Sequence, residues 1–273
     1  MKIPKIFYGT AWKEEKTSDL TFTALQAGFR AIDTANQRKH YFEEGVGEGI
    51  ARFLSESDVT REDLFLQSKF TYQRGQDSRL PYDPESKLRD QVKQSVESSF
   101  EHLKTDYLDS LILHGPFLNE GLSDEDWEVW ESMEQLLKQD KVKSIGVSNF
   151  QLPQLAELSD RVSVKPKFIQ NRCFANTGWD QDVRQLCQSN GILYQGFSLL
   201  TANPAELQSS TVKKIATRHK VTSEQIIFRF SQQIGILPLT GTSSLEHMKL
   251  DLSIGDFELN PEEVEQIENI SLN

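Results

Sequence analysis

Short hydrophobic runs recur along this chain and alternate with longer amphipathic stretches. Eight of the runs have the length of buried strands, are bounded by turn residues and have helical periodicity between them. This alternation predicts an α/β fold in which the strands form a parallel sheet covered by helices. The predicted strands lie at 6–8, 31–32, 64–68, 108–113, 145–147, 168–169, 192–196 and 236–238.

Helical periodicity is clearest in five stretches between and after these runs. Apolar side chains recur there at steps of three and four, and capping residues mark several of the ends. The predicted helices cover 85–103, 125–137, a stretch around 183–187 that Asn190-Gly191 closes, a stretch that opens at 222–225, and a last one from Pro261, after the N-cap Asn260, to about Ile270.

Two architectures share this alternation, the closed (β/α)8 barrel and the open doubly wound sheet. An open sheet that binds a dinucleotide carries a Gly-x-Gly-x-x-Gly turn directly after its first strand. Here residues 9–12 read Gly-Thr-Ala-Trp, and the nearest glycine cluster, at 45–49, lies in a helical stretch. The sequence therefore favours a TIM barrel, with one domain covering residues 1–273. Barrels of this kind take about 250 residues.

Several of the predicted strands end in a residue whose side chain can take part in chemistry. A barrel gathers the carboxyl ends of its strands at one mouth, where essentially all known barrel active sites lie. We therefore expect these side chains to converge from distant parts of the sequence, which predicts an enzyme. They are Asp33, Lys69, His114, Ser148-Asn149 and Gln170.

Composition excludes several other classes of protein. The chain has 41 acidic and 30 basic residues, a net charge of −11, and no sustained basic stripe, so nucleic acid is not an expected partner. Its two cysteines form neither a disulfide framework nor a metal motif, and we expect no metal. No signal peptide and no apolar run of membrane-spanning length is present. We expect a cytoplasmic monomer that does not associate with membranes.

Two longer motifs give the chain a family resemblance. Residues 27–35, followed by Glu-Glu-Gly-Val-Gly at 43–47, resemble the first signature of the aldo-keto reductases, and residues 141–150 are similar to the second. Lys69, His114-Gly115-Pro116 and Gln170 match further landmarks in the same order. The similarity extends from Ile6 to Ile270. It implies a barrel that binds NAD(P)H in extended form and reduces carbonyl groups.

The chemistry of such a site assigns roles to four side chains. Hydride addition leaves negative charge on the carbonyl oxygen, so a proton donor must reach that oxygen. Tyr41 is the candidate donor, and Lys69 beside it would stabilise the tyrosinate and lower the pKa of the hydroxyl. Asp33 would keep Lys69 charged and oriented, and His114 would orient the carbonyl.

The remaining site residues follow from the resemblance. It implies that Ser148, Asn149 and Gln170 hold the nicotinamide carboxamide and that Phe197 stacks on the ring. NADPH is the expected cofactor, with NADH as an alternative. Further contacts with it are expected from Gly9, Thr10, Ser198, Leu200, Thr240, Gly241, Thr242, His247 and Asp251.

Two features depart from the family pattern. Relatives commonly place the tyrosine five residues after the aspartate, at the position of Arg38 here, and counting back from Val46-Gly47 instead lands on His40. Residues 37–40 resemble an insertion, and Tyr41 is chosen because it is the only tyrosine in reach. After the last strand, Leu239 stands where many relatives carry a phosphate-binding lysine, which predicts a modest NADPH preference or dual use.

Substrate choice is less readable. Trp12, just after the first strand, and His114 are the candidate substrate contacts, whereas Trp127 and Trp130 are expected to pack in the core. Short mouth loops and a short tail predict an open pocket and broad aldehyde or ketone use. Two rival functions stay open: a Schiff-base lyase with Lys69 as nucleophile, and a non-catalytic nucleotide sensor on the same fold.

Overall fold

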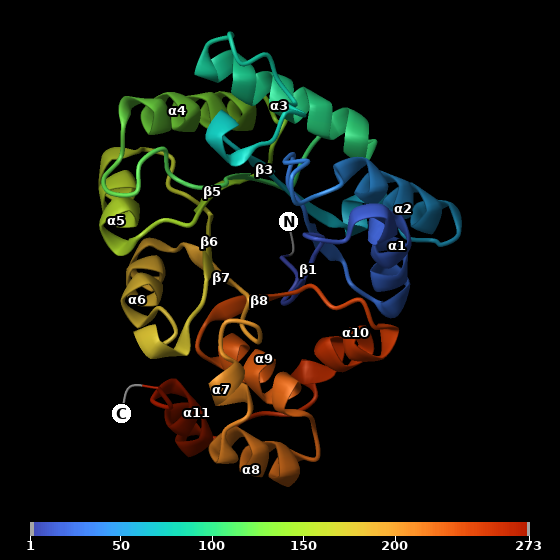
Figure 1. Cartoon of the computed structure of the whole chain (residues 1–273), viewed down its shortest axis with the longest axis vertical. Helices are drawn as coiled ribbons and strands as arrows, with labels where there is room; N and C mark the ends of the chain where they lie inside the picture. Colours follow the sequence, from blue (N-terminus) through green and yellow to red (C-terminus); the bar gives the residue numbers. More distant parts are fainter. Residues whose placement is uncertain (1–2, 272–273) are drawn as a thin grey trace.

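Eight parallel strands form a closed barrel, which confirms the predicted fold class. The computed structural model describes residues 3–271. Each strand pairs with its sequence neighbours, and β8 pairs with β1, which closes the ring seen end-on in Figure 1. The strands are β1 (Phe7–Gly9), β2 (Ala31–Asp33), β3 (Phe65–Phe70), β4 (Ser110–Leu113), β5 (Ile145–Ser148), β6 (Phe168–Arg172), β7 (Leu193–Phe197) and β8 (Ile236–Thr240).

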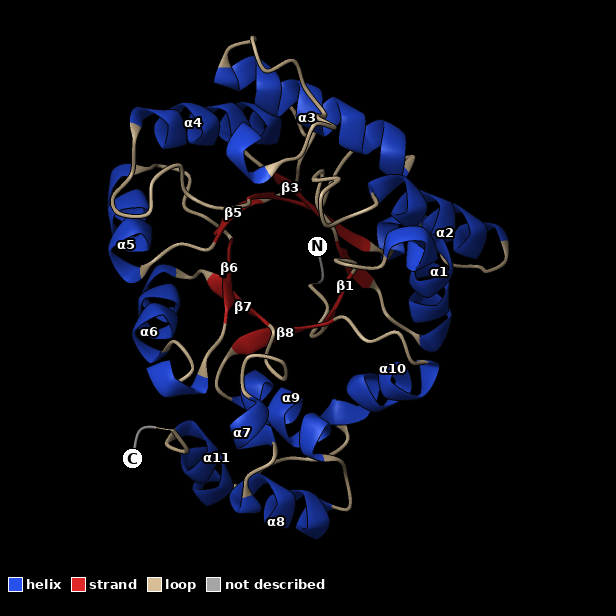
Figure 2. Ribbon diagram, viewed as in Figure 1, coloured by secondary structure: helices blue, strands red, loops and turns tan. Residues whose placement is uncertain are grey.

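Helices connect successive strands and cover the outside of the barrel (Figure 2). The connection from β7 to β8 contains α7, α8 and α9, and the last two helices follow β8. Within residues 3–271, none of the helices is long and apolar enough to cross a lipid bilayer. The helices are α1 (Thr17–Ala27), α2 (Glu43–Ser55), α3 (Leu88–Leu103), α4 (Asp124–Lys138), α5 (Leu152–Arg161), α6 (Gln181–Asn190), α7 (Pro204–Leu207), α8 (Ser210–His219), α9 (Ser223–Gln233), α10 (Leu245–Leu252) and α11 (Pro261–Glu268).

Several element boundaries differ from the predicted ones by a few residues. The helix expected from residue 85 begins at Leu88, and the last helix ends at Glu268 rather than near Ile270. β3 and β6 both continue past the residue predicted to end them, so Lys69 and Gln170 belong to strands. Their backbones are therefore fixed by the hydrogen bonds between strands. Both side chains are placed more rigidly than side chains on a loop would be.

Alternation along the strands divides their side chains between the lumen and the helices. An apolar plug fills the amino-terminal part of the lumen, while a larger cluster packs the outer strand faces against the helices. Two residues further along the same strands, and hence on the same face, the buried polar side chains of Asp33, Gln67 and Gln170 begin. The plug closes the lumen below these polar groups. It consists of Phe7, Ala31, Phe65, Ile112, Phe168 and Leu239.

Two tryptophans of α4 pack as expected. Trp130 is 1% exposed, and Trp127 is partly buried with the Arg161 guanidinium 3.9 Å from its ring centroid. The two cysteines, Cys173 and Cys187, are buried free thiols. These four side chains belong to the packing of the fold and lie outside the cavity described next.

Candidate active site

A cavity of about 710 Å³ opens at the carboxyl ends of the strands. Its position is the one that the barrel fold predicts for an active site. Residues separated by more than 200 positions in the sequence meet on its walls. The predicted site residues that line it are Gly9, Trp12, Asp33, Tyr41, His114, Ser148, Asn149, Gln170, Phe197, Ser198, Leu200, Thr240, Gly241, Thr242, His247 and Asp251.

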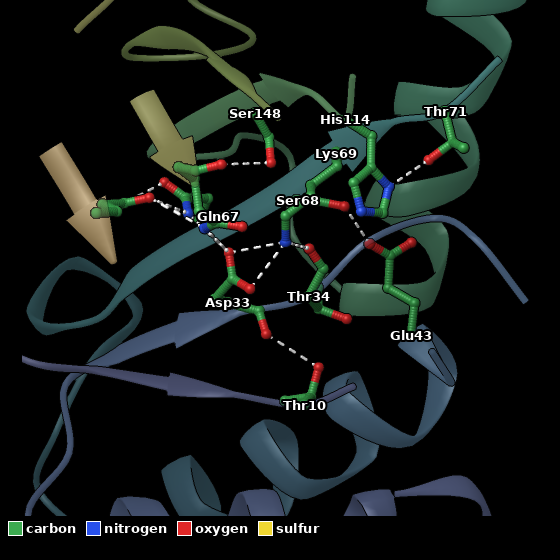
Figure 3. A network of polar contacts seen from close by, with 12 residues as sticks. Thr10, Asp33, Thr34, Glu43, Gln67, Ser68, Lys69, Thr71, His114 and Ser148 are labelled. Atoms are coloured by element: carbon green, nitrogen blue, oxygen red, sulfur yellow. Dashed lines mark hydrogen bonds and ion pairs between the residues drawn. The ribbon is translucent and has the colours of Figure 1, made fainter. Parts of the chain in front are cut away.

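Two predicted site residues do not line the cavity. Lys69 is 1% exposed and lies beneath the floor, where it can act only through its neighbours. Thr10 was expected to contact the cofactor, but its side chain does not reach the cavity. Its side chain is fully buried, and its hydroxyl donates a 3.0 Å hydrogen bond to the backbone oxygen of Asp33. Thr10, directly after β1, is thus bonded to the backbone at the end of β2 (Figure 3).

Asp33 and Lys69 form a buried ion pair at the floor of the cavity (Figure 3). The Lys69 Nζ atom lies 2.8 Å from each carboxylate oxygen of Asp33 and 2.7 Å from the backbone oxygen of Thr34. Burial lowers the pKa of the Lys69 ammonium, while the charge and hydrogen bond of Asp33 oppose that shift. Asp33 therefore orients Lys69 as expected.

A layer of glutamines supports this ion pair from within the lumen. Gln67 and Gln170 each donate a hydrogen bond to Asp33 Oδ1, at 2.7 and 2.9 Å, and both also donate to Gln195 Oε1. Gln67 and Gln195 were not among the predicted site residues. Gln67 could have been found, because it lies two residues before Lys69 on one strand and so faces the same side.

The loop before α2, predicted to carry an insertion, folds into a turn that returns Tyr41 to the floor of the cavity. The backbone N–H groups of His40 and Tyr41 both bond to the oxygen of Gln37. The Tyr41 ring centroid then lies 5.2 Å from Lys69 Nζ and 5.9 Å from the His114 ring centroid. His40 instead stacks on Trp12, with ring centroids 4.1 Å apart. Tyr41, and not His40, lies with the other predicted catalytic groups.

The pKa of the Tyr41 hydroxyl shifts in the direction opposite to the expected one. Burial raises this pKa, and the charge of Asp33 raises it further. Lys69 was expected to lower it, but the lysine ammonium directs its hydrogens at Asp33 and Thr34. Among residues 3–271, the Tyr41 hydroxyl has no hydrogen-bond partner. Tyr41 is thus fully protonated at neutral pH, with its hydroxyl free for a molecule in the cavity.

His114 is a neutral imidazole beside Tyr41. Burial and the charge of Lys69 lower the pKa of His114 to about 3. Its Nδ1 atom lies 2.7 Å from Thr71 Oγ1 (Figure 3), and no described residue bonds to Nε2. If the Thr71 hydroxyl donates, Nε2 carries the proton and can donate to a carbonyl oxygen.

The three residues expected to hold a carboxamide are already bonded to one another or to neighbours. The Ser148 hydroxyl donates to the backbone oxygen of Gln170 at 2.7 Å, and the Asn149 amide nitrogen donates to the backbone oxygen of His114 at 2.8 Å. The side-chain oxygens of Asn149 and Gln170 accept no hydrogen bond from any described residue. These two amide oxygens are therefore the free acceptors that a carboxamide N–H could use.

The other end of the cavity lies between β8 and α10 and has a different character. The Thr240 hydroxyl donates to Asp251 Oδ2 at 2.7 Å, so it is already used within the protein. Burial raises the pKa of the Asp251 carboxyl to about 6, although the Thr240 hydrogen bond opposes the shift. Glu224 and His247 also line this end. Next to this wall the Lys13 ammonium donates a hydrogen bond to the backbone oxygen of Gly241, so this end combines two carboxylates and an imidazole on its surface with one cation beside it.

Comparison with known proteins decides the family. The model of the Aldo/keto reductase family matches residues 5–272. The chain belongs to this family. It is 31% identical to glyoxal reductase of Bacillus subtilis over 91% of this chain and 81% of the relative. It is 29% identical to an NAD/NADP-dependent indole-3-acetaldehyde reductase of Schizosaccharomyces pombe, over 97% of this chain and 91% of the relative.

Solved structures of the family share the barrel. A Bombyx mori aldo-keto reductase in complex with NADP superposes with a TM-score of 0.82 at 26% identity, over 98% of this chain and 89% of that one. This aldo/keto reductase is accordingly an NAD(P)H-dependent oxidoreductase that reduces carbonyl groups. The predicted family, fold and reaction class are confirmed.

Sequence reasoning missed several cavity residues of this aldo/keto reductase. Glu224 comes from α9, and nothing in the linear sequence indicates that this helix begins at the cavity. Arg172 could have been found, since it lies two residues after Gln170 on β6 and so faces the same side. Among the described lining residues, Arg172 is the only lysine or arginine, and its guanidinium lies 5.7 Å from the Phe197 ring centroid.

Proposed function

We propose that this protein reduces small aldehydes and ketones with NADPH, that Tyr41 donates the proton and that His114 orients the carbonyl. Asp33 and Lys69 form the floor of the cavity beneath Tyr41 and His114. The observation that carries this proposal is the meeting of the Tyr41 and His114 rings, 5.9 Å apart, on the cavity wall directly above the buried Asp33–Lys69 pair. Two hydrogen-bond donors then face one carbonyl oxygen from two sides.

The protonation states suit these roles. Tyr41 keeps its proton at neutral pH because burial and Asp33 raise its pKa. An alkoxide is a stronger base than a tyrosinate, so proton transfer from Tyr41 is downhill once the hydride has added. His114 stays neutral because burial lowers its pKa to about 3. It therefore stabilises the oxygen by a hydrogen bond and does not compete as the acid.

The cavity fits a nicotinamide dinucleotide in its donor set. The free amide oxygens of Asn149 and Gln170 suit a carboxamide N–H, and the Phe197 ring offers a stacking face on the same wall. When bound, NADPH supplies the hydride. At the other end the fit is weaker, because the hydroxyl of Thr240 bonds to Asp251 and no lysine or arginine lies among the described lining residues from β8 to α10. We therefore expect at most a modest preference for NADPH over NADH, or use of both.

The mouth supports a broad substrate range with an aromatic contact. Trp12 is 69% exposed and stacks on His40, so an indole face stands open at the entrance. Aromatic aldehydes bury more of this face than small aliphatic ones and should bind more tightly. A cytoplasmic location, a monomeric state and the absence of a nucleic-acid partner stay predictions.

The two rival functions receive less support. A Schiff-base lyase needs a neutral Lys69 that reaches its substrate, but the Lys69 ammonium is bonded to Asp33 and Thr34 below the cavity floor. The sensor hypothesis depended on the lengthened loop before Tyr41. That loop folds into a compact turn that keeps Tyr41 within 5.2 Å of Lys69, measured from ring centroid to Nζ.

The test is an assay of cofactor oxidation with an aromatic aldehyde as substrate. The oxidation is monitored as the loss of absorbance of the reduced nicotinamide. We expect turnover with the wild type and a fall in kcat of about 10²- to 10⁴-fold in Tyr41→Phe, because a general acid contributes that much. The affinity for NADPH should not change. His40→Gln is the matched control from the same loop and should keep most of its turnover. Cofactor binding without turnover over a broad carbonyl panel would favour the sensor instead.

A further inference from the structure

Tyr41 has no side-chain hydrogen bond of its own to hold it above Lys69. Its hydroxyl has no partner among residues 3–271, and its backbone belongs to a loop that is longer than the family pattern. The distance between Tyr41 and Lys69 must therefore be fixed through the backbone on either side of each residue. Tyr41 lies two residues before Glu43, the first residue of α2, and Lys69 directly follows Ser68 on β3.

A direct hydrogen bond joins these two segments. The Ser68 hydroxyl donates to Glu43 Oε1, and Figure 3 shows this bond. Both partners are buried, with Ser68 fully enclosed and Glu43 2% exposed. Successive side chains of a strand point to opposite faces, so Ser68 faces α2 while Lys69 faces the lumen. The bond thus connects the start of α2 to the outer side of the strand that places Lys69.

The second oxygen of Glu43 is held by α3. Its Oε2 atom lies 3.2 Å from His102 Nδ1. One turn further along α2, Gly47 lies so close to α3 that a Cβ atom there would be 1.9 Å from the His102 backbone oxygen. Only glycine permits this approach, and it leaves α2 no room to move toward α3. Glu43 is therefore held on one side by β3 and on the other by α3.

We propose that Glu43 is a positioning residue for the reaction: its hydrogen bond with Ser68 sets the start of α2 against β3 and so fixes Tyr41 over Lys69. The idea rests on the proposed function, in which Tyr41 donates the proton. This hydrogen bond matters more here because the loop that carries Tyr41 resembles an insertion, and a longer loop can adopt more conformations. A displacement of about 1 Å at a reacting group can lower a rate about 100-fold.

A simpler role for Glu43 would be an acidic residue that favours the positive end of α2. That role does not require burial, and the next residue can fill it. The Glu44 side chain is 44% exposed at the same helix start and lies 3.3 Å from His102 Nε2. Glu43 instead turns inward to Ser68, into a site where an unpaired carboxylate would be costly. Burial with two fixed partners favours a positioning role.

The test compares three variants in steady-state turnover with NADPH and an aromatic aldehyde. Ser68→Ala removes only the hydroxyl, and Glu43→Ala removes its acceptor. We expect kcat to fall about 10-fold in Ser68→Ala and about 10- to 100-fold in Glu43→Ala, with KM and the Kd for NADPH nearly unchanged. Glu43→Gln keeps an acceptor for Ser68, so its kcat should stay within about threefold of wild type. Together, Ser68→Ala and Glu43→Ala should lose less than the product of their separate effects.

A matched control is available on the far side of the barrel. Glu263 is also a buried glutamate that accepts a hydrogen bond from a histidine, His219, at 3.0 Å, but it lies in α11 away from the cavity. Glu263→Ala should lower the thermal midpoint and leave kcat unchanged. If Glu43→Ala does not fold, Ser68→Ala still decides the matter.

Three outcomes would overturn the positioning role. Ser68→Ala with wild-type kcat would show that the bond sets no geometry. Glu43→Gln as slow as Glu43→Ala would show that the carboxylate charge acts on Lys69 instead. A rise in the Kd for NADPH in step with the loss of kcat would show general loosening of the site. Two different results would contradict the proposed function itself. One is wild-type protein that does not oxidise NADPH in the presence of an aldehyde, and the other is a Tyr41→Phe variant that oxidises it as fast as wild type.

Discussion

The two ends of the cavity differ in how their charges are satisfied. At the floor, Asp33 and Lys69 neutralise each other in a buried pair, and two glutamines complete the hydrogen bonds of the carboxylate. At the end between β8 and α10, Asp251 is also buried, but its only side-chain hydrogen bond within residues 3–271 comes from Thr240, and Glu224 lines the same wall. One end carries paired charge and the other unpaired acidity.

The difference follows from what each end must bind. In the proposed function the floor must hold the proton donor Tyr41 in one geometry, and preorganised charges do this without rearrangement during the reaction. The β8–α10 end would receive the phosphate-bearing half of a cofactor, and anionic groups there gain little from carboxylates. This teaches that the reaction is built into the barrel, whereas the choice between NADPH and NADH depends on a few side chains that could change without disturbing the chemistry.

The largest expected effect is at the floor. Asp33→Asn leaves the Lys69 ammonium buried without a carboxylate, and we expect the free energy of unfolding to fall by about 3–5 kcal/mol. Chemical denaturation measures this loss. The control is Asp140→Asn, which breaks an exposed pair with Lys143 at 3.4 Å and should cost less than about 1 kcal/mol. Equal losses in the two variants would mean that the floor is not specially organised.

The floor was also the part of the site that the sequence predicted best. Asp33, Lys69 and His114 lie at the ends of short apolar runs, and the closure of a barrel brings such ends together whatever the helices do. Strand alternation also predicts that Gln67, two residues before Lys69, faces the same side of its strand. Prediction succeeds here because strand periodicity and barrel topology together determine which side chains meet.

The rest depended on loops and helices, whose positions periodicity does not determine. The position of Tyr41 could not be counted from either neighbouring motif, because it is set by the turn after Gln37. Glu224 reaches the cavity only because α9 begins there. The direction of the pKa shift of Tyr41 was mispredicted, because burial of the hydroxyl and the charge of Asp33 both raise this pKa, and neither can be read from the linear sequence.

A middle-sized effect is expected at Arg172, whose guanidinium lies on the cavity wall beside Phe197. This residue forms no ion pair within residues 3–271 and is the only lysine or arginine among the described residues that line the cavity. We expect Arg172→Gln to weaken the binding of NADPH and NADH alike by roughly 10-fold, the loss of one charge-assisted hydrogen bond to the pyrophosphate that both share. Fluorescence titration measures both.

The control for Arg172 is Arg161→Gln. Arg161 also lies over an aromatic ring, that of Trp127, but on α5 outside the cavity, so cofactor binding should not change. Weaker binding of NADPH alone in Arg172→Gln would assign this guanidinium to the 2′-phosphate. Arg172 would then bind the phosphate-bearing half of the cofactor. The difference in charge between the two ends of the cavity would be smaller than the lining residues indicate.

The smallest effect concerns pH at the β8–α10 end. Burial raises the pKa of Asp251 to about 6 in the folded protein, so its carboxyl binds a proton below that pH and carries a charge above it. A phosphate nearby would favour the protonated form, and NADPH should therefore bind more tightly at pH 5 than at pH 7. We expect a change of about 3- to 10-fold for NADPH and a smaller one for NADH. Asp251→Asn should therefore reduce this pH dependence. If Asp251→Asn leaves the full pH dependence of NADPH binding intact, the Asp251 carboxyl has no part in cofactor choice.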